Sequence, residues 1–200
     1  MPGIMDAVNR AVAEGDDLYG MVFEGGALEG ARAKSLAFSR CEFRGVRLGK
    51  NEIKHLSFAD CIFRHCDLSG ASLVNASIHR SHLRDCRAVG AQIDGCTISA
   101  ATFESCMLEY LTIAASKITD LRFLACELSH MMLHTCRTKG LTVERSTLNA
   151  AEIVETPLAG VDLSTNAIGG IRIAANDLAG AKISYAQAPQ ICALFGIEIV

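Results

Sequence analysis

Residues 56–70 read LSFAD CIFRH CDLSG, three consecutive blocks of five residues that share one pattern. The third residue of each block is large and apolar, namely Phe58, Phe63 and Leu68. The first residue is small or apolar, and the other three positions are largely polar. Neither the 3.6-residue period of a helix nor the two-residue period of a strand produces this spacing. The stretch therefore has a period of five.

The same period continues on both sides of this stretch. Steps of five from Leu18 to Ile183 visit 34 positions without an insertion, and Thr138 is the one polar residue among them. Seven of the eight phenylalanines occupy this phase. Five residues are too few to form a packed unit, so each block must stack on its neighbours to bury its inward side chains. The pattern predicts a solenoid.

A second inward phase lies two residues before each large apolar residue. It holds Ser81 and eight of the nine cysteines, which are Cys41, Cys61, Cys66, Cys86, Cys96, Cys106, Cys126 and Cys136. Disulfides and a metal site are the alternatives to buried free thiols, but zinc requires ligands that converge on one point. We interpret these cysteines as small hydrophobes that fill the core.

Several blocks resemble the motif of the pentapeptide repeat family, which reads roughly Ala-Asp/Asn-Leu-x-x. CDLSG at 66–70, VDLST at 161–165 and NDLAG at 176–180 are close matches, and the resemblance covers residues 16–184. It implies an all-β solenoid, a right-handed quadrilateral β-helix with four blocks per coil. Residues twenty apart would then stack at the strand spacing of about 4.8 Å. Two internal ladders are expected, one of Phe23, Phe43, Phe63, Leu83, Phe103 and Phe123 and one of Cys66, Cys86, Cys106 and Cys126.

Both ends of such a rod expose unpaired backbone and require a cap. We expect an N-terminal cap at 1–15, in which residues 2–14 form a short amphipathic helix. Its apolar side would hold Ile4, Val8 and Val12.

The β-helix itself would span 16–184, and a C-terminal capping or dimerisation element would span 185–200. The tail predicts a short helix around 189–195, ended by Gly196, and then a strand at 197–200. Its apolar residues form either a plain cap or a twofold dimer contact, and self-complementary apolar ends favour the dimer. The candidate interface residues are Ile191, Leu194, Phe195, Ile197 and Ile199.

Charge is distributed unevenly along the chain. Residues 1–31 carry six acidic residues and one basic residue, residues 32–87 carry eleven basic and five acidic ones, and residues 88–200 carry seven basic and eleven acidic ones. In the basic segment, Arg44, Arg64 and Arg84 are predicted to stack outside the rod. Their mutual repulsion calls for an anionic partner or for interleaved acids such as Glu42 and Asp85, and a solvated face is the favoured interpretation.

Catalytic chemistry has little support in the sequence. His130 and His134 have metal-pair spacing only on a helix, and the glycines at 25, 26 and 30 lack the helix that a phosphate loop requires. We expect no enzyme activity, no cofactor and no metal. The chain has no signal peptide pattern and no apolar run of about 18 residues. We therefore expect a cytoplasmic protein without a membrane partner.

The tail, the repeat count and the uninterrupted repeats resemble one branch of the family. That branch protects DNA gyrase from topoisomerase poisons, and the mycobacterial fluoroquinolone-resistance and albicidin-resistance proteins belong to it. The resemblance implies a homodimer that binds gyrase by imitating the charge of duplex DNA, without binding nucleic acid itself. Candidate contact acids are Glu144, Glu152, Glu155, Asp162 and Asp177. The alternative is a generic dimeric interaction scaffold that has no topoisomerase partner.

Overall fold

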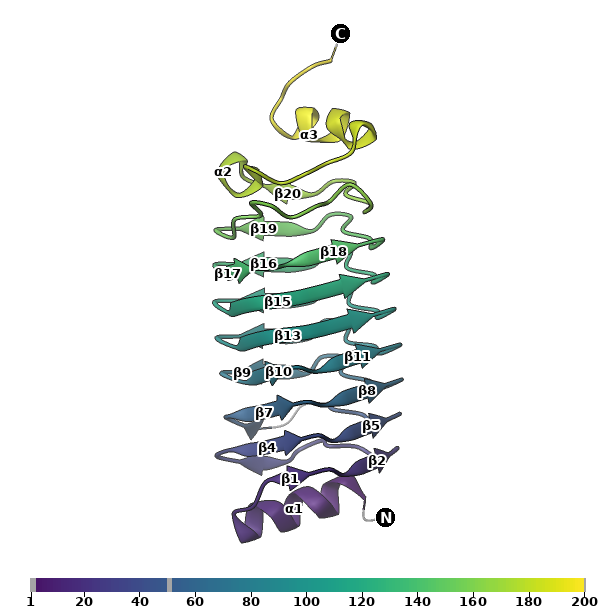
Figure 1. Cartoon of the computed structure of the whole chain (residues 1–200), viewed down its shortest axis with the longest axis vertical. Coiled ribbons are helices and arrows are strands. Elements are labelled where there is room, and N and C mark those ends of the chain that lie inside the picture. Colours follow the sequence, from purple (N-terminus) through teal and green to yellow (C-terminus); the bar gives the residue numbers. More distant parts are fainter. Residues whose placement is uncertain (1–2, 50–51, 200) are drawn as a thin grey trace.

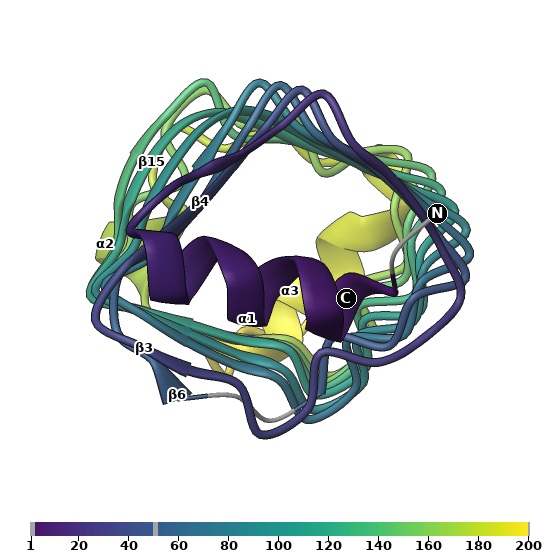
Figure 2. The same cartoon turned by 90° about the horizontal axis from the view of Figure 1, so that it is seen from below.

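The computed structural model of the chain describes residues 3–49 and 52–199. The chain winds into a rod of stacked coils, with helix α1 (Ile4–Glu14) at one end and α3 (Ala188–Leu194) at the other (Figure 1). Along the rod axis each coil is a roughly four-sided frame (Figure 2). Every strand pairing is parallel and joins residues twenty apart, as for Phe43 with Phe63. The predicted β-solenoid is confirmed.

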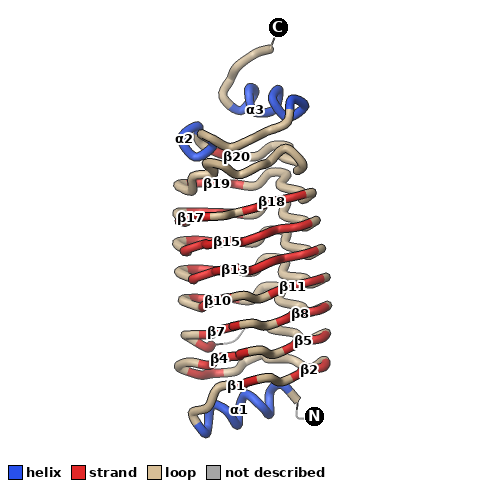
Figure 3. Tube along the Cα trace, viewed as in Figure 1, coloured by secondary structure: helices blue, strands red, loops and turns tan. Residues whose placement is uncertain are grey.

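Short strands form three of the four walls (Figure 3). Wall 1 contains β1 (Leu18–Tyr19), β4 (Leu36–Ser39), β7 (Leu56–Ala59), β10 (Ser77–His79) and β17 (Arg137–Lys139). Wall 2 contains β2 (Val22–Glu24), β5 (Glu42–Arg44), β8 (Ile62–Arg64), β11 (His82–Arg84) and β18 (Thr142–Glu144). The longer strands β13 (Thr97–Glu104) and β15 (Lys117–Leu124) run through both walls.

Wall 4 contains β3 (Arg32–Ala33), β6 (Glu52–Ile53), β9 (Ser72–Val74), β12 (Gln92–Asp94), β14 (Thr112–Ala114), β16 (Met132–His134), β19 (Glu152–Val154) and β20 (Arg172–Ile173). Wall 3, between walls 2 and 4, is held by single bridges such as Arg47 with Asp67. We number the coils from the start of wall 1, so that coil 6 is 116–135, coil 7 is 136–155 and coil 8 is 156–175.

The corners of the frame explain the period of five. Residues at multiples of five turn most corners with a positive φ, for example Arg40 at 53° and Ala125 at 52°. Glycine adopts this conformation freely, as at Gly45 and Gly95, whereas other residues adopt it at a cost of about 1 kcal/mol. Such a turn after every fifth residue returns the chain to the same wall every twenty residues.

The two inward positions of each block form the core, and both predicted ladders are present. The aromatic ladder from Phe23 to Phe123 is in register throughout. Ser81 and the eight cysteines of the small phase are buried, as the repeat predicts. Thr138 differs from the other large-phase residues of its wall because its side chain is half-exposed.

Helix α1 covers the first coil, but its buried face differs from the predicted one. Ile4 and Val8 are buried with Ala7 and Ala11, whereas Val12 is 40% exposed. Residues 4, 7, 8 and 11 lie within about 100° on one helix face, and residue 12 lies at the edge of that face, where its side chain reaches solvent. The predicted position of Val12 was therefore wrong. Within the described residues, every helix is too short or too polar to cross a membrane.

The C-terminal end departs from the repeat. A short helix α2 (Ala175–Leu178) replaces wall 1 after coil 8, and a 3₁₀ turn η1 (Tyr185–Gln187) leads into α3. Gly196 has a φ of 70° and follows the end of α3, as predicted. The strand predicted at 197–200 is wrong for 197–199, which are irregular, and Val200 lies outside the described residues. Within one chain, α3 separates this segment from the last coil, so no strand edge lies beside it (Figure 1).

Candidate interaction surfaces

The arginine ladder of wall 2 is in register, as predicted, but its charge is balanced. The carboxylate of Glu42 accepts bonds from Arg44 at 2.9 Å and from Arg64 at 3.2 Å. Arg44 also reaches Glu24 at 3.0 Å. Hydrogen bonds from Arg44 hold the pKa of Glu42 below its usual value. This part of the ladder is an ion-pair network.

The charge of Arg84, the next arginine of the ladder, is balanced in the same way. Arg84 lies 3.7 Å from Asp85 and 3.7 Å from Glu104, and His82 lies 3.0 Å from the other oxygen of Glu104. Both interleaved acids named from the sequence, Glu42 and Asp85, contact the ladder. The solvated face is therefore the better description, because each arginine already has a carboxylate beside it.

The candidate acids of the C-terminal half lie on different sides of the rod. Glu144 is on wall 2 and lies 3.7 Å from Arg122. Glu152 is on wall 4, where a 2.8 Å hydrogen bond from Arg172 lowers its pKa. Two of the acids are thus paired with arginines on separate walls.

The remaining three candidates are just as dispersed. Glu155 is exposed at the corner between walls 4 and 1 and accepts a 3.2 Å bond from the Thr135 hydroxyl. Asp162 is exposed on wall 2 and accepts a 2.8 Å bond from the Ser164 amide. Asp177 is only 8% exposed, because α2 replaces the regular block and turns this residue inward. Its prediction as a surface acid was wrong, and the other four do not form one face.

The C-terminal end carries the apolar surface predicted for it. Phe195, Ile197 and Ile199 are 41%, 56% and 62% exposed, whereas Ile191 and Leu194 are half-buried against the core. Phe195 also lines a shallow groove of about 250 Å³ with the alanines and isoleucine of the last blocks. One chain therefore leaves an apolar end uncovered.

Gln187 attaches this end to the rod, a role that the sequence pattern did not reveal. Its amide nitrogen donates to the carbonyl oxygens of Leu163 at 2.8 Å and Asn166 at 2.7 Å. Its amide oxygen accepts bonds from the backbone amide and the hydroxyl of Ser184. These contacts are buried, so they fix the start of α3 relative to coil 8.

The cysteine thiols are part of the core. Each sulfur atom of the eight small-phase cysteines donates to the carbonyl oxygen two residues earlier. All of them except that of Cys86 also donate to the carbonyl oxygen twenty-three residues earlier, as Cys126 does to Leu124 and Phe103. Burial raises the pKa of the Cys96 and Cys136 thiols. For these two thiols the raised pKa disfavours the reactive thiolate, which agrees with a packing role. No cluster of three or more metal-ligating side chains occurs among the described residues.

Pro157 interrupts wall 1, whose strands pair without a break from coil 2 to coil 7. On wall 1, a residue at this position normally donates its backbone N–H to the coil before it, as Arg137 does to Ser116 at 3.0 Å. Proline has no N–H to donate. Across residues 3–49 and 52–199, no backbone hydrogen bond joins 137–145 of coil 7 to 157–165 of coil 8. We call this break the coil 7–8 seam.

A change of turn geometry extends the seam across wall 2. In coil 8 the amides of Val161 and Asn166 bond back to Leu158 and Leu163 within their own coil. In coils 3 to 7 the described residues make this local turn on wall 3 alone, as Met131 does to Leu128, so coils 7 and 8 do not match on walls 1 and 2. Walls 3 and 4 stay paired, for example through Leu148 and Ala167 at 2.7 Å.

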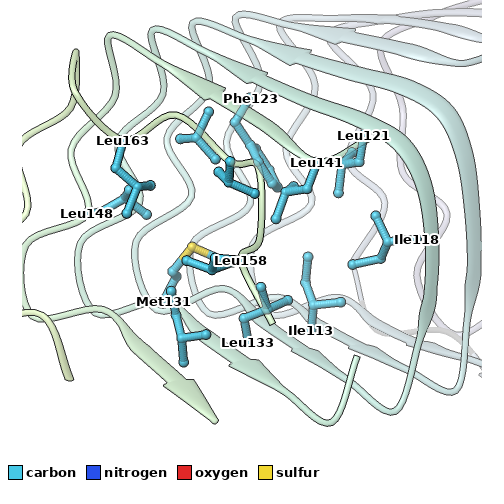
Figure 4. A pocket seen from close by; sticks show the side chains of 13 residues that line it. Ile113, Ile118, Leu121, Phe123, Met131, Leu133, Leu141, Leu148, Leu158 and Leu163 are labelled. Carbon is cyan, nitrogen blue, oxygen red and sulfur yellow. The ribbon is translucent and has the colours of Figure 1, made fainter. Parts of the chain in front are cut away.

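Side chains replace part of the lost backbone pairing at the seam. The Thr138 hydroxyl donates to the Pro157 carbonyl at 3.1 Å, and the Asn166 amide donates to the Val143 carbonyl at 2.8 Å. Behind the seam, the core contains a void of about 20 Å³ that only apolar side chains line (Figure 4). The void forms where the aromatic ladder has ended and smaller side chains such as Val143 follow.

Outside the same seam lies a notch of about 530 Å³. It is lined by Thr135, Cys136, Arg137, Thr138, Glu155, Pro157 and Ala159. The sequence analysis missed this feature. Two features of the sequence could have indicated this notch. Pro157 occupies a position whose backbone N–H normally donates to the preceding coil, and Thr138 occupies a position of the large apolar phase.

Comparisons with known proteins agree with the repeat and the coils. A family model described as a pentapeptide repeat region matches residues 31–113 and 76–153, which together cover more than half of the chain. Among curated proteins, none matches.

Solved structures similar to this chain include a trypsin-treated variant of QnrB1, a plasmid-mediated fluoroquinolone resistance protein. It is 25% identical, with 92% of this chain and 97% of that chain covered and a TM-score of 0.42. Full-length QnrB1 is 16% identical over 90% and 100% of the two chains, with a TM-score of 0.37.

HetL from the cyanobacterium Nostoc sp. strain PCC 7120, a pentapeptide repeat protein involved in heterocyst differentiation regulation, is also similar. It is 14% identical over 91% of this chain and 95% of that one, with a TM-score of 0.33. With a repeat of five, coils of twenty and a family model that covers most of the rod, this chain belongs to the pentapeptide repeat family.

Proposed function

We propose that this chain is a DNA-mimicking protein that binds DNA gyrase, a type II topoisomerase, in the cytoplasm. It would protect gyrase from a poison such as a quinolone or albicidin, and it would do so without catalysis. The proposal builds on the sequence resemblance of the tail and of the uninterrupted repeats. Residues 1–15 would serve as the cap, 16–184 as the rod and 185–200 as the dimerisation element.

The uncovered apolar end is the observation that carries this proposal. Phe195, Ile197 and Ile199 lie beyond the last coil and are 41–62% exposed. A second copy that covered this end by a twofold contact would double the length of the rod. It would also place the acidic C-terminal coils of both chains at the centre, where a DNA-binding groove would meet them.

The acids suited to such a contact are the exposed ones. Glu155 and Asp162 form no ion pair in the described part of the chain, whereas Glu144 and Glu152 share their charge with arginines. Neutralising Glu155 and Asp162 as Glu155→Gln and Asp162→Asn should therefore weaken gyrase binding more than Glu144→Gln and Glu152→Gln do.

A supercoiling assay with purified gyrase tests the function directly. Inhibition of supercoiling by the protein, or rescue of gyrase from a quinolone or albicidin, is the expected result. Absence of both effects at micromolar protein would reject the gyrase proposal. A variant that cannot dimerise, such as Ile197→Glu, serves as the control for the continuous rod.

The second candidate is a generic dimeric scaffold without a topoisomerase partner. The positions of the candidate acids favour it, because a DNA mimic needs its charges along one surface. Glu144 and Asp162 lie on wall 2, whereas Glu152 lies on wall 4 and Glu155 at the corner between walls 4 and 1. Capture of a partner other than gyrase, together with a negative supercoiling assay, would support this candidate.

A further inference from the structure

Three basic side chains on wall 1 have no carboxylate partner. Lys117 of coil 6 is in register with Arg137 of coil 7, and Lys139 lies two residues further along β17 on the same face. All three are exposed. Among the described residues, none of them forms a salt bridge. They constitute a cluster of uncompensated positive charge in the otherwise acidic half of the chain.

This cluster contrasts with the more obvious arginine ladder of wall 2. Arg44, Arg64 and Arg84 are surrounded by carboxylates at 2.9 to 3.7 Å. An anion that approached the ladder would have to displace those acids. An anion that approached Lys117, Arg137 and Lys139 would meet free donors.

The cluster borders the notch outside the coil 7–8 seam. Arg137 lines that notch together with Thr138 and Pro157. The notch exists because Pro157 removes the ladder bond that would hold coil 8 against coil 7. A recess of about 530 Å³ therefore lies beside Arg137, which is in register with Lys117 and shares strand β17 with Lys139.

The spacing of the cations suits a multiply charged oxyanion. The backbones of Lys117 and Arg137, on neighbouring coils, are about 4.8 Å apart. The backbone of Lys139 lies about 6.6 Å from that of Arg137 along the strand. A guanidinium binds a phosphate group through two parallel hydrogen bonds, and lysines add mobile point charges. We propose that Lys117, Arg137, Lys139 and the notch at Pro157 form a binding site for a phosphorylated small molecule.

Glu155 sets the orientation of this ligand. Glu155 lines the same notch as Arg137, and its carboxylate accepts a 3.2 Å bond from Thr135. It repels a second anionic group there but accepts hydrogen bonds from hydroxyl groups. The phosphate therefore lies toward wall 1, and a hydroxyl-bearing part of the ligand occupies the notch. This site shares Glu155 with the proposed gyrase contact, but Lys117, Arg137 and Lys139 are not part of that contact.

Titration with pyrophosphate and with adenosine triphosphate tests the site. At about 0.05 M salt, where screening is weak, both should shift the amide NMR signals of residues 135–139 and 155–159. The variant Lys117→Gln/Arg137→Gln/Lys139→Gln should weaken binding at least about ten-fold. The control Arg44→Gln/Arg64→Gln/Arg84→Gln changes the net charge equally and should weaken binding less than about two-fold.

Three outcomes would overturn the site. The first is the absence of localised shifts at millimolar pyrophosphate and adenosine triphosphate. The second is equal loss of binding in both triple variants, which would indicate attraction by net charge alone. The third is binding of duplex DNA that the wall 1 variant abolishes while the small phosphates have no effect, which would make this face a nucleic-acid surface. Thermal unfolding of each variant checks that the fold is intact.

Discussion

Phe43 and Phe63 are twenty residues apart, and their rings stack with centroids 4.5 Å apart at an angle of 3°. Both rings are buried, and the strands that carry them are in register. The same register continues along wall 2, with Leu83 between Phe63 and Phe103. The aromatic ladder therefore fills the centre of the rod as far as Phe123, beyond which smaller side chains leave the void.

Removal of a ring from this ladder should be costly. Phe63→Ala is expected to lower the free energy of unfolding by about 3–5 kcal/mol, because stacked neighbours on both sides prevent the cavity from collapsing. Urea denaturation measures the loss. The neighbouring outward residue provides the control, and Ile62→Ala should cost less than about 1 kcal/mol. Equal losses in the two variants would contradict a filled core.

Because non-glycine residues turn the corners with a positive φ, a glycine substituted at such a corner should stabilise the fold. Ala125 turns its corner at a φ of 52°, where a Cβ atom is unfavourable. Ala125→Gly should raise the free energy of unfolding by up to about 1 kcal/mol, after the added chain entropy of glycine is deducted. Ala114→Gly, within β14, should lower it by a similar amount. A lower melting temperature for both variants would argue against corner strain.

The coil 7–8 seam should be visible in amide hydrogen exchange. The amides of Thr138, Gly140 and Val143 make no bond to coil 8, whereas Ile118 and Phe123 belong to strand pairs with the next coil. We expect exchange at least about ten-fold faster at the three seam amides. Uniform protection along walls 1 and 2 would show that the seam is closed in solution.

The Glu42 network gives a stability that depends on pH. Hydrogen bonds from Arg44 lower the pKa of Glu42 in the folded chain below its usual 4.5. The stabilisation is therefore complete above pH 4.5 and is lost as the pH falls through the lower folded value. Glu42→Gln should cost less than about 1 kcal/mol at neutral pH, since the arginines are exposed. The free energies of unfolding of the parent protein and of Glu42→Gln, measured at pH 7 and below pH 3, should differ at the higher pH and agree at the lower one.

If the protein forms the proposed dimer, its mass in solution should depend on the exposed apolar residues of the C-terminal end. Ile197→Glu places a charge in the uncovered apolar surface and should convert a dimer into a monomer in light scattering. Val12→Glu changes another exposed apolar residue, at the opposite end of the rod, and should leave the dimer intact. A monomeric parent protein would reject the dimer and with it the continuous rod.

The period of five in the sequence determined the solenoid class and the inward residues, and the resemblance to the pentapeptide repeat family implied the four blocks per coil that set the register. A solenoid repeats the same local contacts in each coil, so Phe43 must lie above Phe23 once a coil of twenty residues is known. The arginine ladder followed by the same logic. The sequence also indicated the apolar character of both ends, although it misplaced Val12 and the final strand.

Only the tertiary structure decided which charges are free. The ladder of Arg44, Arg64 and Arg84 had the sequence signal of an anion site but proved to be neutralised. Lys117, Arg137 and Lys139 had no such signal and yet remain unpaired among the described residues. The physical reason is that a carboxylate within about 4 Å decides whether a cation is available, and that neighbour often belongs to another coil. The inward pattern is set within each block, whereas the outward charges depend on how whole coils stack and on where Pro157 stops them from matching.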